Sequence, residues 1–405
     1  MTTLVCEGMV VSRHSNTYTG RGAAWSVALV LIAVAVVIIV RVWGSPDRAV
    51  TGSQYIAPAY NQSSQNFSIV CVGGEGNRTP PSTMTYSSEV TNGIVGPWNS
   101  TAGNVMLLGA ACADYNKTAY CVGGAGSDGA TSFNTTRYAS LSTTSGLWWN
   151  FSSPYPYKIK YEGCTTGSGN IYCVGGIKEV GSFSAAAFSM VNLTYYAVLS
   201  ANGIGQWTES FPYPNNVVQP TCAYYNSTVY CLQGYNLGSP PYLSGATNYG
   251  QVYYSHVVAN STLTHWIFAG NYPAMRTIAV SYPNDTYHNT TLGIVLSSCN
   301  AYSGYLYCVG GASGIYSVNR TYYARILTNG GLGQFVNTTS YPVDISRTSC
   351  VIGDGIIYCI GGMTNTGVIP TIYSASLSSS GISAWSESSN GLPVPLYGMS
   401  CFATS

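Results

Sequence analysis

The sequence predicts an all-β protein of six four-stranded antiparallel sheets, preceded by one membrane-spanning helix. Three observations support this prediction. A short apolar motif ending in a double glycine recurs along the chain, and pairs of cysteines nine residues apart bracket tight turns. An uncharged apolar run of 18 residues, 23–40, lies near the N-terminus.

The glycine motif marks a repeat of about 50 residues. Measured at the final glycine, the intervals are 50, 52, 58, 77 and 51 residues, and the copies are IVCVGG (69–74), AYCVGG (119–124), IYCVGG (171–176), VYCLQG (229–234), LYCVGG (306–311) and IYCIGG (357–362). A Tyr-containing segment and then an aromatic residue follow each copy; the aromatics are Trp98, Trp148, Trp207, Trp266, Phe335 and Trp385. Alternating strands separated by turns predict a four-stranded antiparallel sheet in each unit.

The cysteine spacing predicts hairpin disulfides. Five pairs are nine residues apart: Cys112 and Cys121, Cys164 and Cys173, Cys222 and Cys231, Cys299 and Cys308, Cys350 and Cys359. Asp354-Gly355, at the centre of the last pair, favours a two-residue hairpin turn. The cysteines then form an open antiparallel pair with Cα atoms about 4.5 Å apart, within reach of a disulfide. Metal binding is the alternative, but zinc sites favour shorter spacings with more ligands nearby.

The apolar strand, the double glycine, the downstream Tyr and the Trp resemble the kelch repeat. The resemblance covers roughly residues 66 to 405 and implies a six-bladed β-propeller. A different β-repeat of similar period is the alternative.

The same resemblance suggests how the ring closes. Cys71 has the double glycine of a second strand but no cysteine nine residues before it, and Cys401 ends the chain like an unpartnered first strand. Kelch propellers are commonly closed by pairing such a C-terminal strand with the first unit, which implies a Cys71–Cys401 disulfide. Cys6 remains as a free thiol before the apolar run.

The apolar run divides the chain. It is long enough to span a bilayer, so we expect a cytoplasmic segment (1–22), a transmembrane signal anchor (23–43), a polar linker (44–65) and the propeller (66–405). A buried helix, a cleavable signal peptide and an archaeal pilin-like signal are the alternatives; arginines on both sides leave the orientation open.

Glycosylation sequons suggest which side of the membrane the propeller occupies. All fourteen Asn-X-Ser/Thr sequences follow the apolar run: Asn61, Asn66, Asn77, Asn99, Asn116, Asn134, Asn150, Asn192, Asn226, Asn260, Asn284, Asn289, Asn319 and Asn337. With the cysteines, they predict an extracellular glycoprotein of a cell membrane or virion envelope.

Composition and motifs argue against several functions. A formal net charge of +1 gives no footprint for nucleic acid. There is no paired-carboxylate, Gly-X-Ser-X-Gly or phosphate-binding motif, and we expect no cofactor, bound metal or catalysis. Kelch-like copper oxidases use Tyr and His ligands, but the four histidines, His14, His256, His265 and His288, do not form such a set.

Only 7% of the residues are charged, so few carboxylates can be protonated and the surface would change little in acid. This composition hints at an acidic exterior.

The kelch resemblance also indicates a binding face. Its inner positions lie three residues before each first cysteine: Gly109, Tyr161, Gln219, Leu296, Arg347 and Gly398. Arg347 matches a position where kelch domains often contact ligand; a solvated or locally paired cation is the alternative. Three long loops (177–191, 235–251 and roughly 272–296) add Tyr235, Tyr242 and Arg276, so the expected face comprises Tyr161, Gln219, Tyr235, Tyr242, Arg276 and Arg347.

These inferences favour a membrane-anchored surface protein that binds a protein or glycan partner. Its composition resembles that of surface proteins of thermoacidophilic archaea or their viruses. A carbohydrate-active or oxidative propeller enzyme and a purely structural surface-layer or virion component are the alternatives.

Overall fold

The computed structural model describes residues 66–404 except for 77–81, 104–106, 128–130, 142–146, 181–186, 233, 237–246, 249 and 281–287. Residues 62–405 form one compact unit. The predicted cytoplasmic segment, membrane helix and most of the linker, all within 1–65, lie outside the described residues. Within the described ranges no helix is long and apolar enough to cross a membrane. The described chain is all β, as predicted.

Six antiparallel sheets of four or five strands make up most of the described chain. Sheet 1 contains β36 (Tyr397–Thr404), β1 (Phe67–Glu75), β2 (Met84–Thr91), β3 (Ile94–Val95) and β4 (Asn99–Ala102); sheet 2 contains β5 (Ala111–Tyr115), β6 (Thr118–Val122), β7 (Thr136–Ser140) and β8 (Asn150–Phe151). Sheet 3 contains β10 (Gly163–Gly167), β11 (Asn170–Val174), β14 (Thr194–Ser200), β15 (Gly203–Ile204) and β16 (Thr208–Glu209).

The second half of the chain repeats this order. Sheet 4 contains β17 (Thr221–Tyr225), β18 (Thr228–Leu232), β21 (Gln251–His256) and β22 (Ile267–Asn271); sheet 5 contains β25 (Ser298–Tyr302), β26 (Tyr305–Val309), β29 (Thr321–Arg325) and β30 (Val336–Asn337). Sheet 6 contains β31 (Ser349–Gly353), β32 (Ile356–Ile360), β33 (Ile372–Ser378), β34 (Gly381–Ile382) and β35 (Ser386–Glu387).

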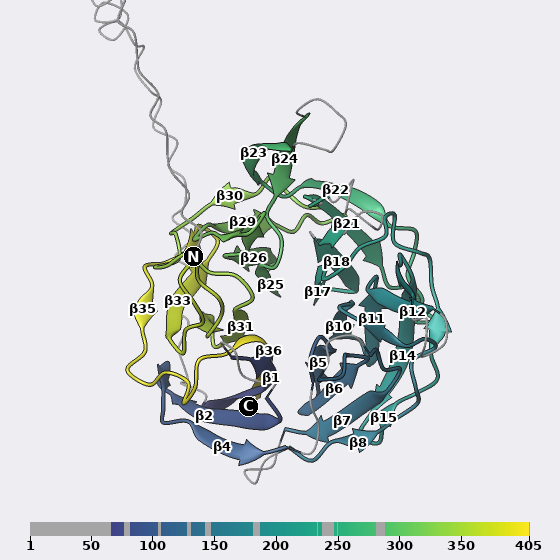
Figure 1. Ribbon diagram of the computed structural model, residues 1–405, viewed down its shortest axis with the longest axis horizontal. Coiled ribbons are helices and arrows are strands. Elements are labelled where there is room, and N and C mark those ends of the chain that lie inside the picture. Colours follow the sequence, from purple (N-terminus) through teal and green to yellow (C-terminus); the bar gives the residue numbers. More distant parts are fainter. Residues whose placement is uncertain are drawn as a thin grey trace, which may run out of the picture. The chain divides into compact units, whose positions relative to one another are not determined.

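The six sheets stand around a central axis (Figure 1). Their innermost strands contact one another in the order β36, β5, β10, β17, β25, β31 and back to β36. Hydrogen bonds link neighbours along this inner circle: the Ser298 Oγ accepts one from the Cys350 N–H at 3.0 Å, and the Ser349 Oγ accepts one from the Cys401 N–H at 3.0 Å. The inner circle is therefore closed.

Each hairpin between the first and second strand is joined by a disulfide. The five pairs are those expected from the nine-residue spacing, with Cα atoms 4.0–4.2 Å apart. In the last hairpin Asp354 and Gly355 both have left-handed φ angles, 50° and 74°, as a type I′ turn requires. The turn thus fixes the register that places the two cysteines opposite each other.

Sheet 1 joins the two ends of the described chain. β1 pairs antiparallel with β36 in a register that sets Cys71 opposite Cys401, and a disulfide joins them across 330 residues. β36 is the innermost strand of this sheet. The C-terminal segment therefore supplies the inner strand of a sheet whose other strands come from residues 67–102.

Apolar cores fill the spaces between neighbouring sheets, and a tyrosine hydrogen bond crosses four of the six. The Tyr that precedes the second-strand cysteine is buried, and its hydroxyl donates to a carbonyl of the next sheet in four units. The donor and acceptor pairs are Tyr120 to Ser200 (2.9 Å), Tyr172 to Ser261 (3.1 Å), Tyr307 to Ser378 (2.8 Å) and Tyr358 to Gly93 (3.2 Å). In sheet 4 the corresponding Tyr230 hydroxyl is buried, and it has no hydrogen-bond partner among the residues that the structure describes.

The repeated Trp also ties neighbouring sheets. The Trp207 indole donates to the Ser153 carbonyl at 3.2 Å, and its ring meets Tyr155 edge-on at 4.8 Å. In sheet 2 this position belongs to Trp149, which is buried, whereas Trp148 is 68% exposed. The prediction of Trp148 was wrong by one residue, because adjacent residues of an extended chain point to opposite sides.

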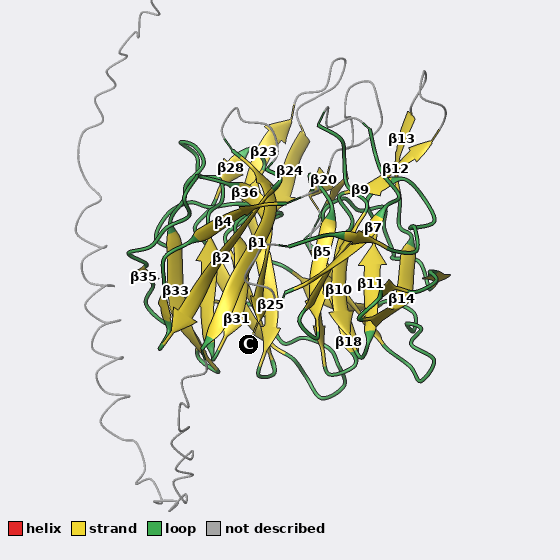
Figure 2. Cartoon of the chain, turned by 90° about the horizontal axis from the view of Figure 1, so that it is seen from below, coloured by secondary structure: helices red, strands yellow, loops and turns green. Residues whose placement is uncertain are grey.

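The three long loops contain strands that the sequence did not predict. Residues 177–191 form the hairpin of β12 (Ile177–Val180) and β13 (Ala187–Met190), which pairs with β9 (Ile159–Lys160). Residues 235–251 contain β19 (Tyr235–Asn236) and β20 (Thr247–Asn248), and 272–296 contain β23 (Ala274–Val280) and β24 (His288–Gly293). With β27 (Ala312–Ser313) and β28 (Tyr316–Ser317), these short sheets lie toward one end of the propeller axis (Figure 2).

The closing disulfide is predicted to stabilise the fold more than any hairpin disulfide. In the chain-entropy treatment its removal costs about 6 kcal/mol, against about 3 kcal/mol for a nine-residue loop. Chemical denaturation of the Cys71→Ser/Cys401→Ser and Cys350→Ser/Cys359→Ser variants compares the two free energies of unfolding. Equal losses in the free energy of unfolding would show that the closing disulfide stabilises the fold no more than a hairpin disulfide does.

The Tyr hydroxyl ties are predicted to be worth about 1 kcal/mol each. Tyr307→Phe should lower the free energy of unfolding by about this amount, because the Ser378 carbonyl loses its donor. Tyr230→Phe is the matched control: it removes a buried hydroxyl that has no partner and should leave stability unchanged or slightly higher. Equal losses for both variants would refute a role for the hydrogen bond.

Candidate functional site

Six equivalent residues surround the axis at one end of the inner circle. Each lies three residues before the innermost cysteine of its sheet, and all have left-handed φ angles: Gly109 59°, Tyr161 60°, Gln219 51°, Leu296 61°, Arg347 53° and Gly398 66°. Residues other than glycine rarely adopt this backbone conformation. Four of the six positions nevertheless carry large ones, so strain is accepted where these side chains are presented.

Backbone hydrogen bonds join successive members of this circle. The Tyr161 N–H donates to the Gly109 carbonyl (2.8 Å) and the Gln219 N–H to the Tyr161 carbonyl (2.7 Å). On the other side, the Arg347 N–H donates to the Leu296 carbonyl (3.1 Å) and the Gly398 N–H to the Arg347 carbonyl (2.9 Å). The circle is therefore a rigid base for the side chains that it carries.

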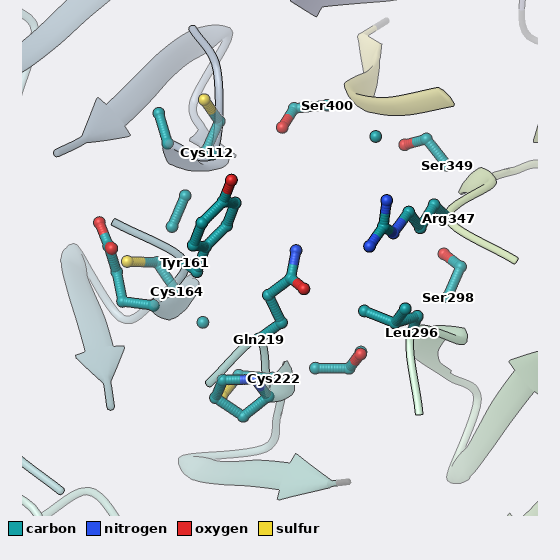
Figure 3. Close-up of a pocket in the computed structure, with 18 of the residues that line it drawn as sticks. Cys112, Tyr161, Cys164, Gln219, Cys222, Leu296, Ser298, Arg347, Ser349 and Ser400 are labelled. Atoms are coloured by element: carbon teal, nitrogen blue, oxygen red, sulfur yellow. The ribbon is translucent and has the colours of Figure 1, made fainter. Parts of the chain in front are cut away.

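The circle opens into a cavity of about 290 Å³ on the axis. Tyr161, Gln219 and Arg347 project toward its middle, with Ser298, Ser349 and Ser400 around its wall (Figure 3). The two glycines leave one side open. A Cβ at Gly109 would lie 2.6 Å from the Tyr161 ring, so glycine there also makes room for the tyrosine.

A second cavity of about 190 Å³ shares Tyr161, Gln219 and Arg347 with the first and adds Glu75, Tyr235 and Tyr397. The Tyr235 hydroxyl donates to the Gln219 Oε1 at 2.9 Å. The Tyr397 hydroxyl donates to the Glu75 Oε2 at 2.5 Å. Together the two cavities form a funnel whose lining includes one cation (Arg347), two carboxyl groups (Glu75 and Glu162), three phenols and an amide.

Arg347 is the positive centre of this funnel. Its guanidinium carbon lies 5.5 Å from the centre of the Tyr397 ring. Among the described residues the ion pair is Lys158 with Glu179, so no described carboxylate lies within ion-pair distance of Arg347. Its charge remains available to a ligand.

The three phenols respond to burial and to these charges. Burial raises the pKa of Tyr397 to about 12, the hydrogen bond to Glu75 acts in the same direction, and Arg347 opposes them. Burial also raises the pKa values of Tyr161 and Tyr235, again with Arg347 acting in the opposite direction. All three are therefore neutral donors at physiological pH.

A buried carboxyl group, Glu162, belongs to the wall of the first cavity. Neither of its oxygens has a hydrogen-bond partner among the described residues, and the Tyr155 hydroxyl nearby is also unpaired. Burial raises the pKa of Glu162 to about 8, and the backbone N–H groups of Glu162 and Ala111 act weakly in the opposite direction. Asp114 shows the same effect, with its pKa raised by burial to about 6.

The funnel brings together four of the six residues of the expected binding face: Tyr161, Gln219, Tyr235 and Arg347. Tyr242 lies outside the described residues, and Arg276 belongs to β23, where its side chain is not described. Whether these residues bind a ligand stays a prediction.

Glu75, Glu162 and Tyr397 are the ionisable residues of the funnel that the sequence did not single out. Glu75 directly follows the double glycine, and Tyr235 occupies the same position in sheet 4. Tyr397 directly precedes a residue of the inner circle, Gly398. A polar residue directly after the double glycine was the available signal.

The sequon asparagines that the structure describes do not line the funnel. Eight asparagines are exposed, namely Asn66, Asn99, Asn116, Asn134, Asn150, Asn226, Asn260 and Asn337, and Asn192 and Asn319 are partly buried. Asn61, Asn77, Asn284 and the side chain of Asn289 lie outside the described part. No sequon asparagine is among the residues lining either cavity.

The structure shows no other candidate centre in its described ranges. His256 lies beside Thr228 (Nδ1 to Oγ1, 3.1 Å) and His265 beside Phe211, with ring centres 3.8 Å apart. Neither lines the funnel. No group of three or more His, Cys, Asp or Glu side chains among the described residues could hold a metal ion.

Comparison with known proteins identifies the fold. No family model matches the sequence. No curated protein matches it either. The chain is similar to the solved structure titled "Structure of YjhT", with a TM-score of 0.51 and 13% sequence identity over 71% of this chain and 86% of that one. YjhT is a β-propeller, and the ring of sheets is accordingly a β-propeller fold. Its disulfides are typical of an oxidising, extracellular environment.

Glu162 is predicted to make the propeller less stable as pH rises. Its pKa in the folded state, about 8, exceeds the ordinary 4.5, so between these values the folded chain holds a proton that the unfolded chain has released. The free energy of unfolding then falls with increasing pH, by up to about 1.4 kcal/mol per pH unit.

Thermal unfolding of residues 62–405 between pH 5 and pH 8 measures this slope. Glu162→Gln should flatten it, while the same change at the exposed Glu89 should not. An unchanged slope in the Glu162→Gln variant would show that the carboxyl does not titrate in this range.

Proposed function

We propose that this protein is a membrane-anchored extracellular glycoprotein whose six-bladed kelch-type propeller binds a protein or glycan partner. The partner enters the funnel and presents an anionic group to Arg347. Surface recognition, adhesion or a place in an envelope are the roles that this activity would serve.

Arg347 is the observation that carries the proposal. Arg347 has a strained, left-handed backbone conformation on the hydrogen-bonded circle. Its guanidinium has no carboxylate partner among the described residues, so it can bind an anionic group of a ligand. Guanidinium groups bind carboxylate, sulfate and phosphate through paired hydrogen bonds.

The other funnel residues suit a hydroxylated or peptide-like partner. Tyr161 offers a neutral hydroxyl donor, and the Gln219 amide nitrogen can donate as well. Tyr235 and Tyr397, whose hydroxyls already donate to Gln219 and Glu75, offer flat apolar rings and hydroxyl oxygens that can accept. Rigid aromatic residues with a few polar groups are typical of recognition surfaces. The sequon asparagines among the described residues do not line the funnel, which is consistent with a funnel that stays open in a glycosylated protein.

A second candidate function is catalysis on a carbohydrate at the same place. The specific observation is the Glu75 carboxylate bonded to the Tyr397 hydroxyl at 2.5 Å near Arg347. Such a pair could transfer a proton to a bound substrate. Release of products from oligosaccharides incubated with the protein would favour this function over binding alone.

Binding is predicted to depend on Arg347. Residues 62–405 applied to an array of neutral, uronic-acid and sulfated glycans and of acidic peptides should retain anionic members. Arg347→Ala should weaken that signal roughly tenfold or more, the effect of losing a charge-assisted hydrogen bond.

Arg325→Ala is the matched control, because Arg325 is exposed on β29 and does not line the funnel. It should bind like the unaltered chain. Equal binding by the Arg347→Ala and Arg325→Ala variants, or retention of neutral ligands alone, would contradict the proposed role.

A further inference from the structure

The residue directly before the innermost cysteine differs from sheet to sheet around the first cavity. In chain order these positions carry Ala111, Gly163, Thr221, Ser298, Ser349 and Ser400, and all six line the cavity. The three serines belong to sheets 5, 6 and 1, whose innermost strands are consecutive in the ring. Serine hydroxyls at this position are therefore gathered on one side of the axis.

Two of these serines are held in place by the backbone of the next sheet. The Ser298 Oγ accepts a hydrogen bond from the N–H of Cys350 at 3.0 Å. The Ser349 Oγ accepts one from the N–H of Cys401, also at 3.0 Å. Each hydroxyl keeps its own hydrogen for donation, and neither has an acceptor for it among the residues that the structure describes. Within the same residues, the Ser400 hydroxyl has no hydrogen-bond partner.

The threonine at the equivalent position of sheet 4 differs, because its hydrogen is already used. The Thr221 Oγ1 donates to the Ser297 carbonyl at 2.9 Å. Sheets 2 and 3 carry Ala111 and Gly163 here, which have no hydroxyl. The hydroxyl donors that the fold leaves available at this level thus come from sheets 5, 6 and 1.

Arg347 lies in the middle of this group, on sheet 6 and two residues before Ser349. Its guanidinium enters the cavity from the side of the three serines, whereas Tyr161 and Gln219 project from other parts of the wall (Figure 3). Glu162 lines the same cavity, but burial raises its pKa to about 8, so that it is largely uncharged at neutral pH and does not repel an anion. One side of the cavity is thus a cation flanked by hydroxyl donors.

We propose that this side of the cavity binds a tetrahedral oxyanion, the sulfate or phosphate monoester of a sugar. The inference rests on the proposed function, in which an anionic group of the partner meets Arg347, and it identifies that group. A guanidinium engages two oxygens of an anion in one plane.

The three serines require an acceptor outside that plane. They come from three successive sheets, so their hydroxyls are spread along an arc around the axis. A monoester has a third terminal oxygen, which lies out of the guanidinium plane and can accept from them. A carboxylate has two oxygens, and both lie in the plane when it pairs with a guanidinium.

The second cavity indicates what carries the ester. Glu75 places a carboxylate there, and a carboxylate repels a second anionic group. A peptide with several acidic residues is therefore disfavoured. Sugar hydroxyls can donate to Glu75, and the flat faces of a sugar ring can pack on Tyr161 and Tyr235. A partner with one ester and several hydroxyls suits both cavities.

Calorimetric titration of the whole chain with a hexose sulfate, a hexose phosphate and the uronic acid of the same hexose tests this inference. Both esters should bind about tenfold or more tightly than the uronic acid, and the tighter ester identifies the source of the oxyanion. Ser400→Ala should weaken binding of the esters about tenfold, because one hydrogen bond to a charged group is lost, and should change binding of the uronic acid less than about twofold.

Thr221→Val is the matched control, because Thr221 lines the same cavity but its hydrogen is used by the Ser297 carbonyl. It should bind both esters like the unaltered chain, and thermal unfolding verifies that each variant is folded. Equal affinity for the uronic acid and the esters, or unchanged ester binding by the Ser400→Ala variant, would overturn the inference and leave the role of Arg347 standing.

Two further outcomes are distinct from these. A phosphoserine peptide that binds more tightly than the hexose phosphate would overturn the assignment to a sugar. Failure of the unaltered chain to bind any of these anionic ligands would overturn the inference together with the proposed function.

Discussion

The pairing of β1 with β36 is the contact on which the rest of the structure depends. A sheet with two apolar faces must be covered on both. Sheet 1 shares one apolar core with sheet 6 and another with sheet 2. Ile69 belongs to the first core and Val70 to the second, because adjacent residues of β1 point to opposite faces of the sheet. If the C-terminal strand left this sheet, both cores would open. The disulfide between residues 330 positions apart therefore holds two interfaces at once.

The same closure completes the funnel. Tyr397 and Gly398 come from the C-terminal strand and its approach, Glu75 comes from the end of β1, and the hydrogen bond from Tyr397 to Glu75 spans 322 residues. Fold stability and the shape of the candidate site thus depend on one contact. The proposed function uses a departure from the repeat, Arg347 on the inner circle, where the other five equivalent positions carry no arginine.

Much of the fold follows from local patterns. Two-residue turns such as Asp354-Gly355 fix hairpin register, and register places cysteines nine residues apart opposite each other. Such features need only the repeat and the geometry of a strand. The inward position of Tyr161, Gln219 and Arg347 was expected from the kelch resemblance, whereas their left-handed φ angles were not predicted.

Other features depend on contacts that no local pattern encodes. Two adjacent tryptophans, Trp148 and Trp149, fit the repeat equally well, and only packing between sheets decides which is buried. The hairpin of β12 and β13 lies in a loop that reads as an irregular insertion, because its partner β9 precedes it by a full hairpin. Glu162 gives no signal in the sequence either, since its raised pKa comes from burial against sheet 2.

Non-reducing peptide mapping by mass spectrometry tests the central claim, closure of the ring, most directly. A closed ring predicts one linked peptide that joins Cys71 to Cys401, together with five intrachain loops whose cysteines are nine residues apart. Recovery of Cys71 or Cys401 as a free thiol, or linked to a cysteine of any other sheet, would contradict it.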